Sequence, residues 1–209
     1  MSRKSYTGIF MALAASSFIM IGFSQAASAQ ENQRVRVRGT IESLNGDMLI
    51  VKTREGSDAT VALKSGWKVA GIKKASVDDI KVGDFVGVAS LPKGTGPDGA
   101  IEVLIFPAAM KGTGEGSRPW DVQPNSSMTN ATVSNAVKAV DGHTITLTYQ
   151  GKEKIISIAD GTPIVTFAAA TKDDLKPGAG VIVMAEKAAD GNISAAQVTI
   201  GVNGVMPPM

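Results

Sequence analysis

Alternating apolar and polar residues dominate the first half of the chain. Val35, Val37 and Ile41 fall on one face of an extended segment, and a row of arginines falls on the other. A period of two is typical of a half-buried strand. Runs of the same kind, separated by Gly, Pro and Asn turns, predict further strands at 48–53, 59–63, 85–91 and 100–106, with a connection over 66–74.

One phrase occurs twice, at 76–88 and again at 171–183. Each copy has a hydroxyl residue, a carboxylate three positions on, then a lysine and a glycine: Ser76, Asp79, Lys81, Gly83 and Thr171, Asp174, Lys176, Gly178. This order predicts a capped helical turn that ends at a left-handed glycine and leads into a buried strand. The acidic pairs Asp78/Asp79 and Asp173/Asp174 also suit a metal site or an acid–base pair, but capping explains both copies with one cause.

The apolar pattern then restarts. Val133, Val137 and Val140 match Val37, Ile41 and Leu44 at a constant offset, and Asp141-Gly142 replaces Asn45-Gly46 as the hairpin signal. Each unit has the order strand, hairpin, strand, strand, short helix, strand, strand. We therefore predict an all-β protein of two tandem small antiparallel β-barrels. Each is OB-like, with five strands and a short helix between strands 3 and 4. An SH3-like barrel is the alternative.

The N-terminus predicts export. Arg3 and Lys4 precede an uncharged apolar stretch, and Ala27-Ser28-Ala29 is a small-residue cleavage site. A membrane anchor is the alternative, but the apolar stretch is short for a bilayer span. We expect a signal peptide cleaved after Ala29 and a periplasmic protein. The predicted parts are a signal peptide at 1–29, a first barrel at 30–107, a Gly/Pro/Ser-rich connecting segment at 108–131, and a second barrel with a Pro-rich tail at 132–209.

Charge and composition exclude several partners. The chain has 21 basic and 19 acidic side chains, and cleavage would remove Arg3 and Lys4, leaving 19 of each. A near-neutral protein lacks the long-range attraction that dominates nucleic-acid binding, so the Arg34/Arg36/Arg38 row is interpreted as a solvated strand face. The absence of cysteine excludes disulfides and thiolate chemistry. No nucleic-acid partner and no membrane span after cleavage are expected.

No pattern in the chain predicts catalysis. The single histidine, His143, follows a hairpin turn, where a solvent-facing side chain is expected, and no nucleophile motif is present. Thioethers suit soft metals such as Cu(I), but Met110, Met128, Met184, Met206 and Met209 show no metal-binding spacing. We therefore expect no enzyme activity, no cofactor, and no catalytic or metal residues.

The connecting segment carries residues that a flexible linker does not need. Trp120 and Met128 offer apolar surface beside Arg118 and Asp121, the mixture of anchor and polar rim that interfaces favour. These four residues are the predicted binding site, for a periplasmic protein or a small ligand. The alternative is that Trp120 plugs the seam between the two barrels.

Several motifs together resemble an uncharacterised family of exported proteobacterial proteins with tandem OB-like β-barrel domains. They are the opening Gly39–Ser43, the repeated phrase, the stretches 111–121 and 128–133, and the end Pro207-Pro208-Met209. The resemblance implies a periplasmic tandem barrel and carries no activity. The predicted function is non-catalytic binding or scaffolding through barrel faces and the connecting segment. The alternative is a metal or cationic-compound binding protein of stress-response type.

Overall fold

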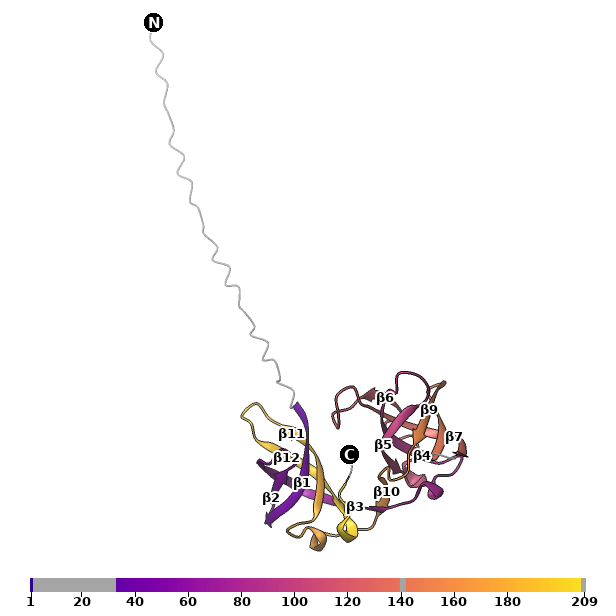
Figure 1. The fold of residues 1–209 in the computed structure, drawn as a ribbon. Helices are drawn as coiled ribbons and strands as arrows, with labels where there is room; N and C mark the ends of the chain where they lie inside the picture. Colours follow the sequence, from indigo (N-terminus) through magenta and orange to yellow (C-terminus); the bar gives the residue numbers. More distant parts are fainter. Residues whose placement is uncertain (2–32, 140–141, 208–209) are drawn as a thin grey trace. The chain divides into compact units, whose positions relative to one another are not determined.

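A computed structural model describes Met1, residues 33–139 and residues 142–207, and groups residues 31–209 into one compact unit. The predicted signal peptide lies outside the described residues except for Met1. The described chain is all-β (Figure 1). Its strands are β1 Gln33–Asn45, β2 Met48–Thr53, β3 Asp58–Lys74, β4 Phe85–Leu91, β5 Asp98–Ile105, β6 Gly116–Pro119, β7 Ser127–Ala139, β8 Gly142–Tyr149, β9 Lys152–Ile158, β10 Ile164–Ala168, β11 Gly180–Lys187 and β12 Ile193–Gly201. Short 3-10 turns lie at η1 Val77–Asp79, η2 Ala108–Met110, η3 Lys172–Asp174 and η4 Val202–Gly204.

Strands from the two ends of the described chain close into a five-stranded barrel, called here the terminal barrel. Its order is β1-β2-β3-β12-β11, and β11 returns to β1. All neighbours are antiparallel except β3 and β12, which run parallel and close the barrel. Its core is almost wholly aliphatic, with Trp67 as the one aromatic among the buried side chains described. Successive side chains of each strand point alternately into and out of the barrel, so one face of every strand lines this core.

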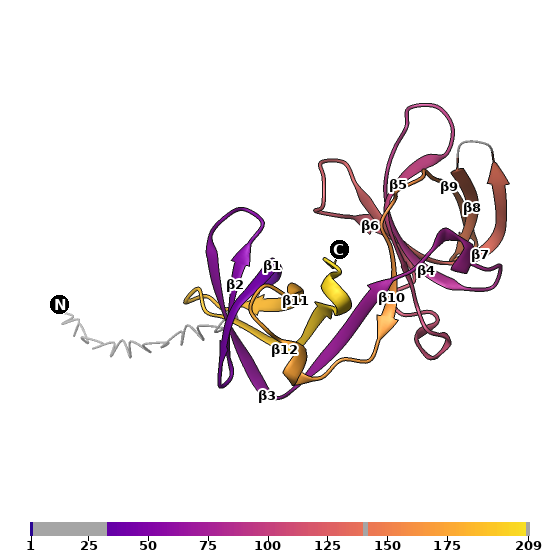
Figure 2. The ribbon, with the colours of Figure 1, turned by 60° about the horizontal axis from the view of Figure 1, so that its bottom comes forward.

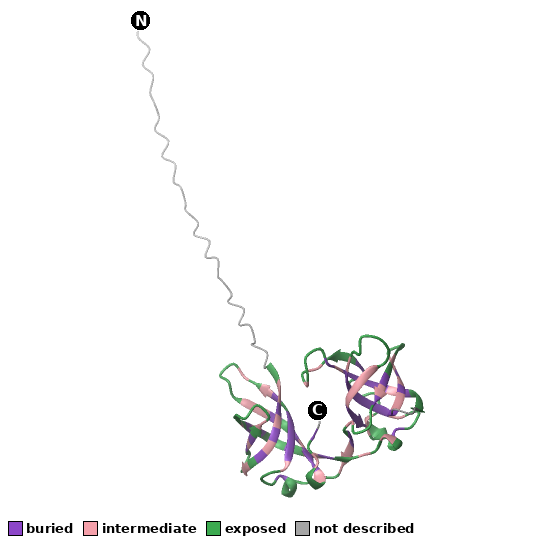
Figure 3. Cartoon of the chain, viewed as in Figure 1, coloured by how far each residue is buried: buried purple, intermediate pink, exposed green. Residues whose placement is uncertain are grey.

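The middle of the chain forms a second ring of paired strands, called here the central ring. Its order is β7-β8-β9-β5-β4, and β4 returns to β7 (Figure 2). Again one pair is parallel, β5 with β9, but it consists only of Asp98 opposite Ile156 and Gly99 opposite Ser157. Aliphatic side chains fill the interior, and buried positions follow the strands in Figure 3.

The pairings do not confirm two tandem barrels at 30–107 and 132–209. Each ring takes three strands from one of these ranges and two from the other. The terminal barrel combines 33–74 with 180–201, whereas the central ring is the uninterrupted stretch 85–158. Strand β10 lies between the two, antiparallel to the end of β3 and parallel to β5. None of the helical turns in residues 33–139 and 142–207 has the length and hydropathy of a membrane span.

In both copies of the repeated phrase the carboxylate caps the turn as predicted. The Asp79 carboxylate accepts a hydrogen bond from the Ser76 backbone N–H at 2.7 Å, and Asp174 accepts one from Thr171 at 2.7 Å. Gly83 and Gly178 have φ of +96° and +86°, the left-handed region that glycine tolerates. The next apolar residue of each copy enters a different core: Ile80 lies in the central ring and Leu175 in the terminal barrel. The phrase therefore leads the chain into the ring that follows it.

The predicted connection at 66–74 is wrong, because β3 continues to Lys74. Residues 68–72 pair with β12 and residues 71–74 with β10. Both partners come from more than 90 residues further along the chain, so no local signal could reveal them.

The predicted strands 48–53 and 85–91 match β2 and β4 in their bounds. The predicted hairpin residue Asp141 and the matching residue Val140 lie outside the described residues.

Candidate binding site

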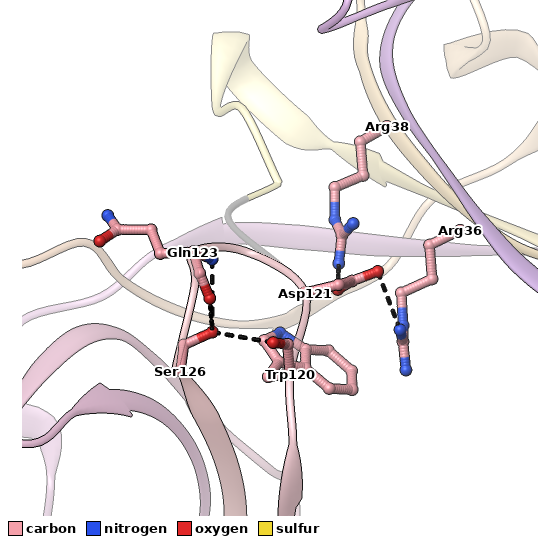
Figure 4. Close-up of polar contacts among 6 residues, drawn as sticks. All are labelled: Arg36, Arg38, Trp120, Asp121, Gln123 and Ser126. Atoms are coloured by element: carbon pink, nitrogen blue, oxygen red, sulfur yellow. Dashed lines mark hydrogen bonds and ion pairs between the residues drawn. The ribbon is translucent and has the colours of Figure 1, made fainter.

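The connecting segment reaches the terminal barrel through one carboxylate. Arg36 and Arg38 lie two apart on β1, so both point out of the barrel on the face opposite Val37. The Asp121 Oδ2 atom lies 3.0 Å from Arg36 Nη1, and Oδ1 lies 2.7 Å from Arg38 Nη2 (Figure 4). Each carboxylate oxygen thus has its own guanidinium partner. These hydrogen bonds, above all that from Arg38, lower the pKa of Asp121 to about 2.

Trp120 completes the contact beside Asp121. The Arg36 guanidinium carbon lies 3.8 Å from the centroid of the Trp120 ring, and that of Arg118 lies 5.7 Å away. Both distances are within the range of a cation–π interaction. The indole therefore lies against the arginine that also holds Asp121, and Trp120 is only half-buried.

Glu102 is a buried carboxyl group at the same place. It alternates with Val103, which lies in the central core, so Glu102 points out of the central ring, yet only 3% of it is exposed. Burial is the main cause that raises the pKa of Glu102 to about 7. Asp121 raises this pKa further, whereas Arg38, Arg54 and Trp120 lower it. Glu102 thus has a pKa near neutral pH and lies close enough to Asp121 and Arg38 for both charges to affect it. The name arginine seam is used here for Arg36, Arg38, Glu102, Trp120 and Asp121.

The arginine seam leaves polar atoms unpaired. In the described part of the chain, four buried side-chain atoms have no hydrogen-bond partner, and all four belong to the seam: Arg36 Nε, Arg38 Nε, Glu102 Oε1 and Trp120 Nε1. The indole N–H is close enough to Glu102 to favour its ionised form but does not reach hydrogen-bonding geometry. Buried polar groups are nearly always paired in native proteins. The four unpaired atoms therefore lie together in this one cluster.

A hollow of about 580 Å³ opens beside the seam. Three arginines line it, Arg34 and Arg36 from β1 and Arg118 from β6, together with Trp120. Its apolar wall includes Met184, which is 56% exposed. Glu186 also lines it, but its carboxylate lies 2.7 Å from Lys64 Nζ. The hollow therefore presents a net positive charge beside apolar surface.

Three of the four predicted binding residues meet in this region. Trp120 and Asp121 belong to the seam, and Arg118 lines the hollow while its Nη1 donates to the Gly114 carbonyl at 3.0 Å. Met128 does not join them: it lies in β7 with 2% of its surface exposed. Trp120 lies between Arg36 of the terminal barrel and Arg118 of β6, the strand that pairs with β7.

Sequence reasoning missed the partners of these residues. The interpretation of the arginine row as a solvated face is wrong for Arg36 and Arg38, because Asp121 holds both and the Arg38 side chain is only 11% exposed. The site residues predicted from the sequence do not include Glu102. A glutamate between two apolar residues of a predicted strand, Ile101-Glu102-Val103, was the available signal.

A second polar cluster lies on the central ring. The Lys154 ammonium lies 3.0 Å from Asp98 Oδ2 and donates to the hydroxyls of Ser90 at 3.1 Å and Ser127 at 2.9 Å. A lysine beside serines invites comparison with Ser–Lys nucleophiles, in which the lysine must accept a proton. Here the lysine Nζ atom also lies against the Asp98 carboxylate, and Ser90 has no exposed surface. The cluster thus fixes β4, β7 and β9 to one another.

The remaining candidates stay apart from the seam. His143 on β8 has its Nε2 3.8 Å from Asp78 Oδ1. Within residues 33–139 and 142–207, no group of three or more His, Cys, Asp or Glu side chains is placed to hold a metal ion. Comparison of the chain with protein-family models, curated proteins and solved structures finds no match.

Proposed function

We propose that this is an exported, non-catalytic binding protein of the periplasm, which takes an anionic ligand into the arginine-lined hollow. The observation that carries the proposal is the convergence of Arg34, Arg36 and Arg118 on one hollow with Trp120 beside it. Guanidinium groups bind carboxylates and phosphates through paired hydrogen bonds. The hollow lies where a barrel face meets the connecting segment, the two surfaces through which we predicted that binding occurs.

The finer description of the fold belongs to the same proposal. We infer two OB-like barrels derived from an internal repeat, with strands 4 and 5 exchanged between the copies. The strand order 1-2-3-5-4 with a parallel 3–5 pair, present in both rings, supports this inference. The signal-peptide pattern and the resemblance to exported proteobacterial proteins support the periplasmic location. The alternative of metal or cationic-compound binding gains no supporting geometry from the described residues.

Calorimetric titration of the mature protein with inorganic phosphate and with acetate tests the binding. We expect binding at low ionic strength that weakens as salt is added, because screening shortens the reach of the charges. The double variant Arg34→Ala/Arg118→Ala should bind at least about tenfold more weakly, the loss of roughly one charge-assisted hydrogen bond. Lys68→Ala, which removes an exposed cation elsewhere on β3, is the control and should bind normally. Absence of binding to either anion, or equal binding by the double variant, contradicts the proposal.

A further inference from the structure

Asp121 occupies a site that has the geometry of a carboxylate-binding pair. Two guanidinium groups from one strand each contact a different oxygen, at 3.0 and 2.7 Å. The carboxylate comes from a segment more than 80 residues away in the sequence. Its side chain is 49% exposed, so solvent reaches the contact. A two-oxygen group gives each guanidinium one oxygen partner, as the Asp121 carboxylate does.

The closed seam is incompletely satisfied. The Nε atoms of both clamping arginines, together with Trp120 Nε1 and Glu102 Oε1, are buried without hydrogen-bond partners in the described part of the chain. Movement of Trp120 and Asp121 away from the barrel would expose these atoms to water. The cost of losing the Asp121 contacts is therefore partly offset by the hydration of four polar atoms.

The segment that carries Asp121 is held together by its own hydrogen bonds. The Ser126 hydroxyl lies 3.0 Å from the Trp120 carbonyl oxygen and 2.7 Å from that of Gln123 (Figure 4). The Trp120 backbone N–H also donates to the Ser126 carbonyl at 2.8 Å. Residues 120–126 thus form a compact loop that can leave the arginines without losing these internal bonds.

We propose that Asp121 is a displaceable internal ligand, and that Arg36 and Arg38 bind a carboxylate group of an external ligand when loop 120–126 leaves. This inference rests on the proposed function, and it names the chemical class of the ligand and the residues that recognise it. Arg34 and Arg118 in the adjacent hollow attract the incoming anion. Asp121 then competes with the ligand as a tethered carboxylate.

Fluorine NMR of the mature protein labelled with 5-fluorotryptophan tests the displacement. The chain has two tryptophans. Trp120 reports on the loop, and Trp67, whose Nε1 donates to Asp47 at 3.0 Å inside the terminal barrel, is the internal reference. Titration with N-acetylaspartate amide should shift the Trp120 signal and leave Trp67 in place. N-acetylasparagine amide, which has the same shape without the charge, should shift neither. Acetate carries the same group as a free acid, and its affinity relative to N-acetylaspartate amide distinguishes a small acid from an acidic side chain of a partner.

Two variants give the decisive comparison. Asp121→Asn removes the internal competitor, so N-acetylaspartate amide should bind at least about tenfold more tightly. Arg38→Gln removes one half of the clamp and should weaken binding by at least about tenfold. The matched control is Asp58→Asn, which breaks the exposed Lys52–Asp58 pair at 2.9 Å on the same barrel and should change neither affinity.

The inference is overturned if Asp121→Asn binds no more tightly than the parent, or if N-acetylasparagine amide binds equally well. Anion binding that depends on Arg34 and Arg118 while the Trp120 signal stays fixed would also overturn it, and would leave the proposed function intact. Absence of any anion binding would contradict both this inference and the proposed function.

Discussion

The terminal barrel and the central ring share one strand order but are assembled from the chain in different ways. The central ring is continuous in sequence, from β4 to β9, and closes through only two residue pairs. The terminal barrel joins the two ends of the chain and closes through eight residue pairs between β3 and β12. Closure of the terminal barrel therefore depends on contacts between distant residues, which form slowly and late. A ring built of neighbouring strands can fold first and hold β3 and β11 near each other.

Removing the C-terminal strands gives the largest expected effect. A chain that ends at Ala179 lacks β11 and β12, which leaves β1 and β3 without their partners and opens the core. We expect the terminal barrel to unfold while the central ring persists. Amide NMR spectra should lose the dispersed signals of residues 33–74 and keep those of 85–158. Residues 30–107 alone, the range predicted for a first tandem barrel, should give no folded monomer, and a well-dispersed spectrum from that fragment would contradict the exchanged arrangement.

Gly39→Ala adds one carbon atom to the terminal barrel and should lower the stability of that barrel rather than that of the central ring. The backbone of β2 passes so close to Gly39 that an added Cβ would lie 1.8 Å from the Lys52 carbonyl oxygen. The strands must move apart, and we expect a loss of about 3 kcal/mol in the free energy of unfolding. Chemical denaturation followed at Trp67, in the terminal barrel, measures it. The neighbouring Thr40→Ala should change stability by less than about 1 kcal/mol. Equal midpoints for the two variants would mean that β1 and β2 adjust easily.

Glu102→Gln tests whether the buried carboxyl group of the arginine seam makes the stability of the protein depend on pH. The pKa of Glu102 is about 7 in the folded protein and has an ordinary value of 4.5. Because the folded-state pKa is raised, the stability that this group contributes is fully present below pH 4.5 and is lost as the pH rises to about 7. Above pH 7 the ionised, buried carboxylate destabilises the parent by at most about 3 kcal/mol.

The Glu102→Gln variant should therefore be more stable than the parent at pH 8 and similar to it near pH 4.5. Urea denaturation at both values measures the difference. Glu153→Gln, at an exposed position on β9, is the control and should leave the parent's pH dependence unchanged. A parent and a Glu102 variant with parallel stability–pH curves would show that this carboxyl group is not the one that titrates.

The sequence predicted local structure better than it predicted which elements pair. Alternation located β2 and β4 in their bounds, and the repeated phrase located both capped turns, because these signals lie within a few residues of each other. The pairing of β4 and β5 with β7 and β9, and of β11 and β12 with β1 and β3, escaped prediction. Two strands with the same apolar face suit either ring, and nothing in residues 85–105 distinguishes β7 from β1 as a partner.

In the arginine seam, too, the sequence indicates unusual single residues but not their partners. Trp120 and Asp121 stood out as unusual residues in a Gly-rich segment, and they do form the contact. Arg36 and Arg38 alternated like any exposed strand face, and their role depends on a carboxylate 85 and 83 residues away. Glu102 acquires its raised pKa only from burial by residues of other elements. Properties that arise from tertiary contacts leave little trace in the local sequence.

Ser76→Ala and Thr171→Ala, with the smallest expected effect, test whether the two regions are capped alike. Each change removes an N-cap hydroxyl and should cost about 0.5–2 kcal/mol. The two turns precede apolar residues in different cores, Ile80 in the central ring and Leu175 in the terminal barrel. The two losses should therefore add in the double variant, as for distant and independent sites. Chemical denaturation of the two single variants and the double variant measures this. A double variant that loses clearly more or less than the sum would show that the two turns interact energetically.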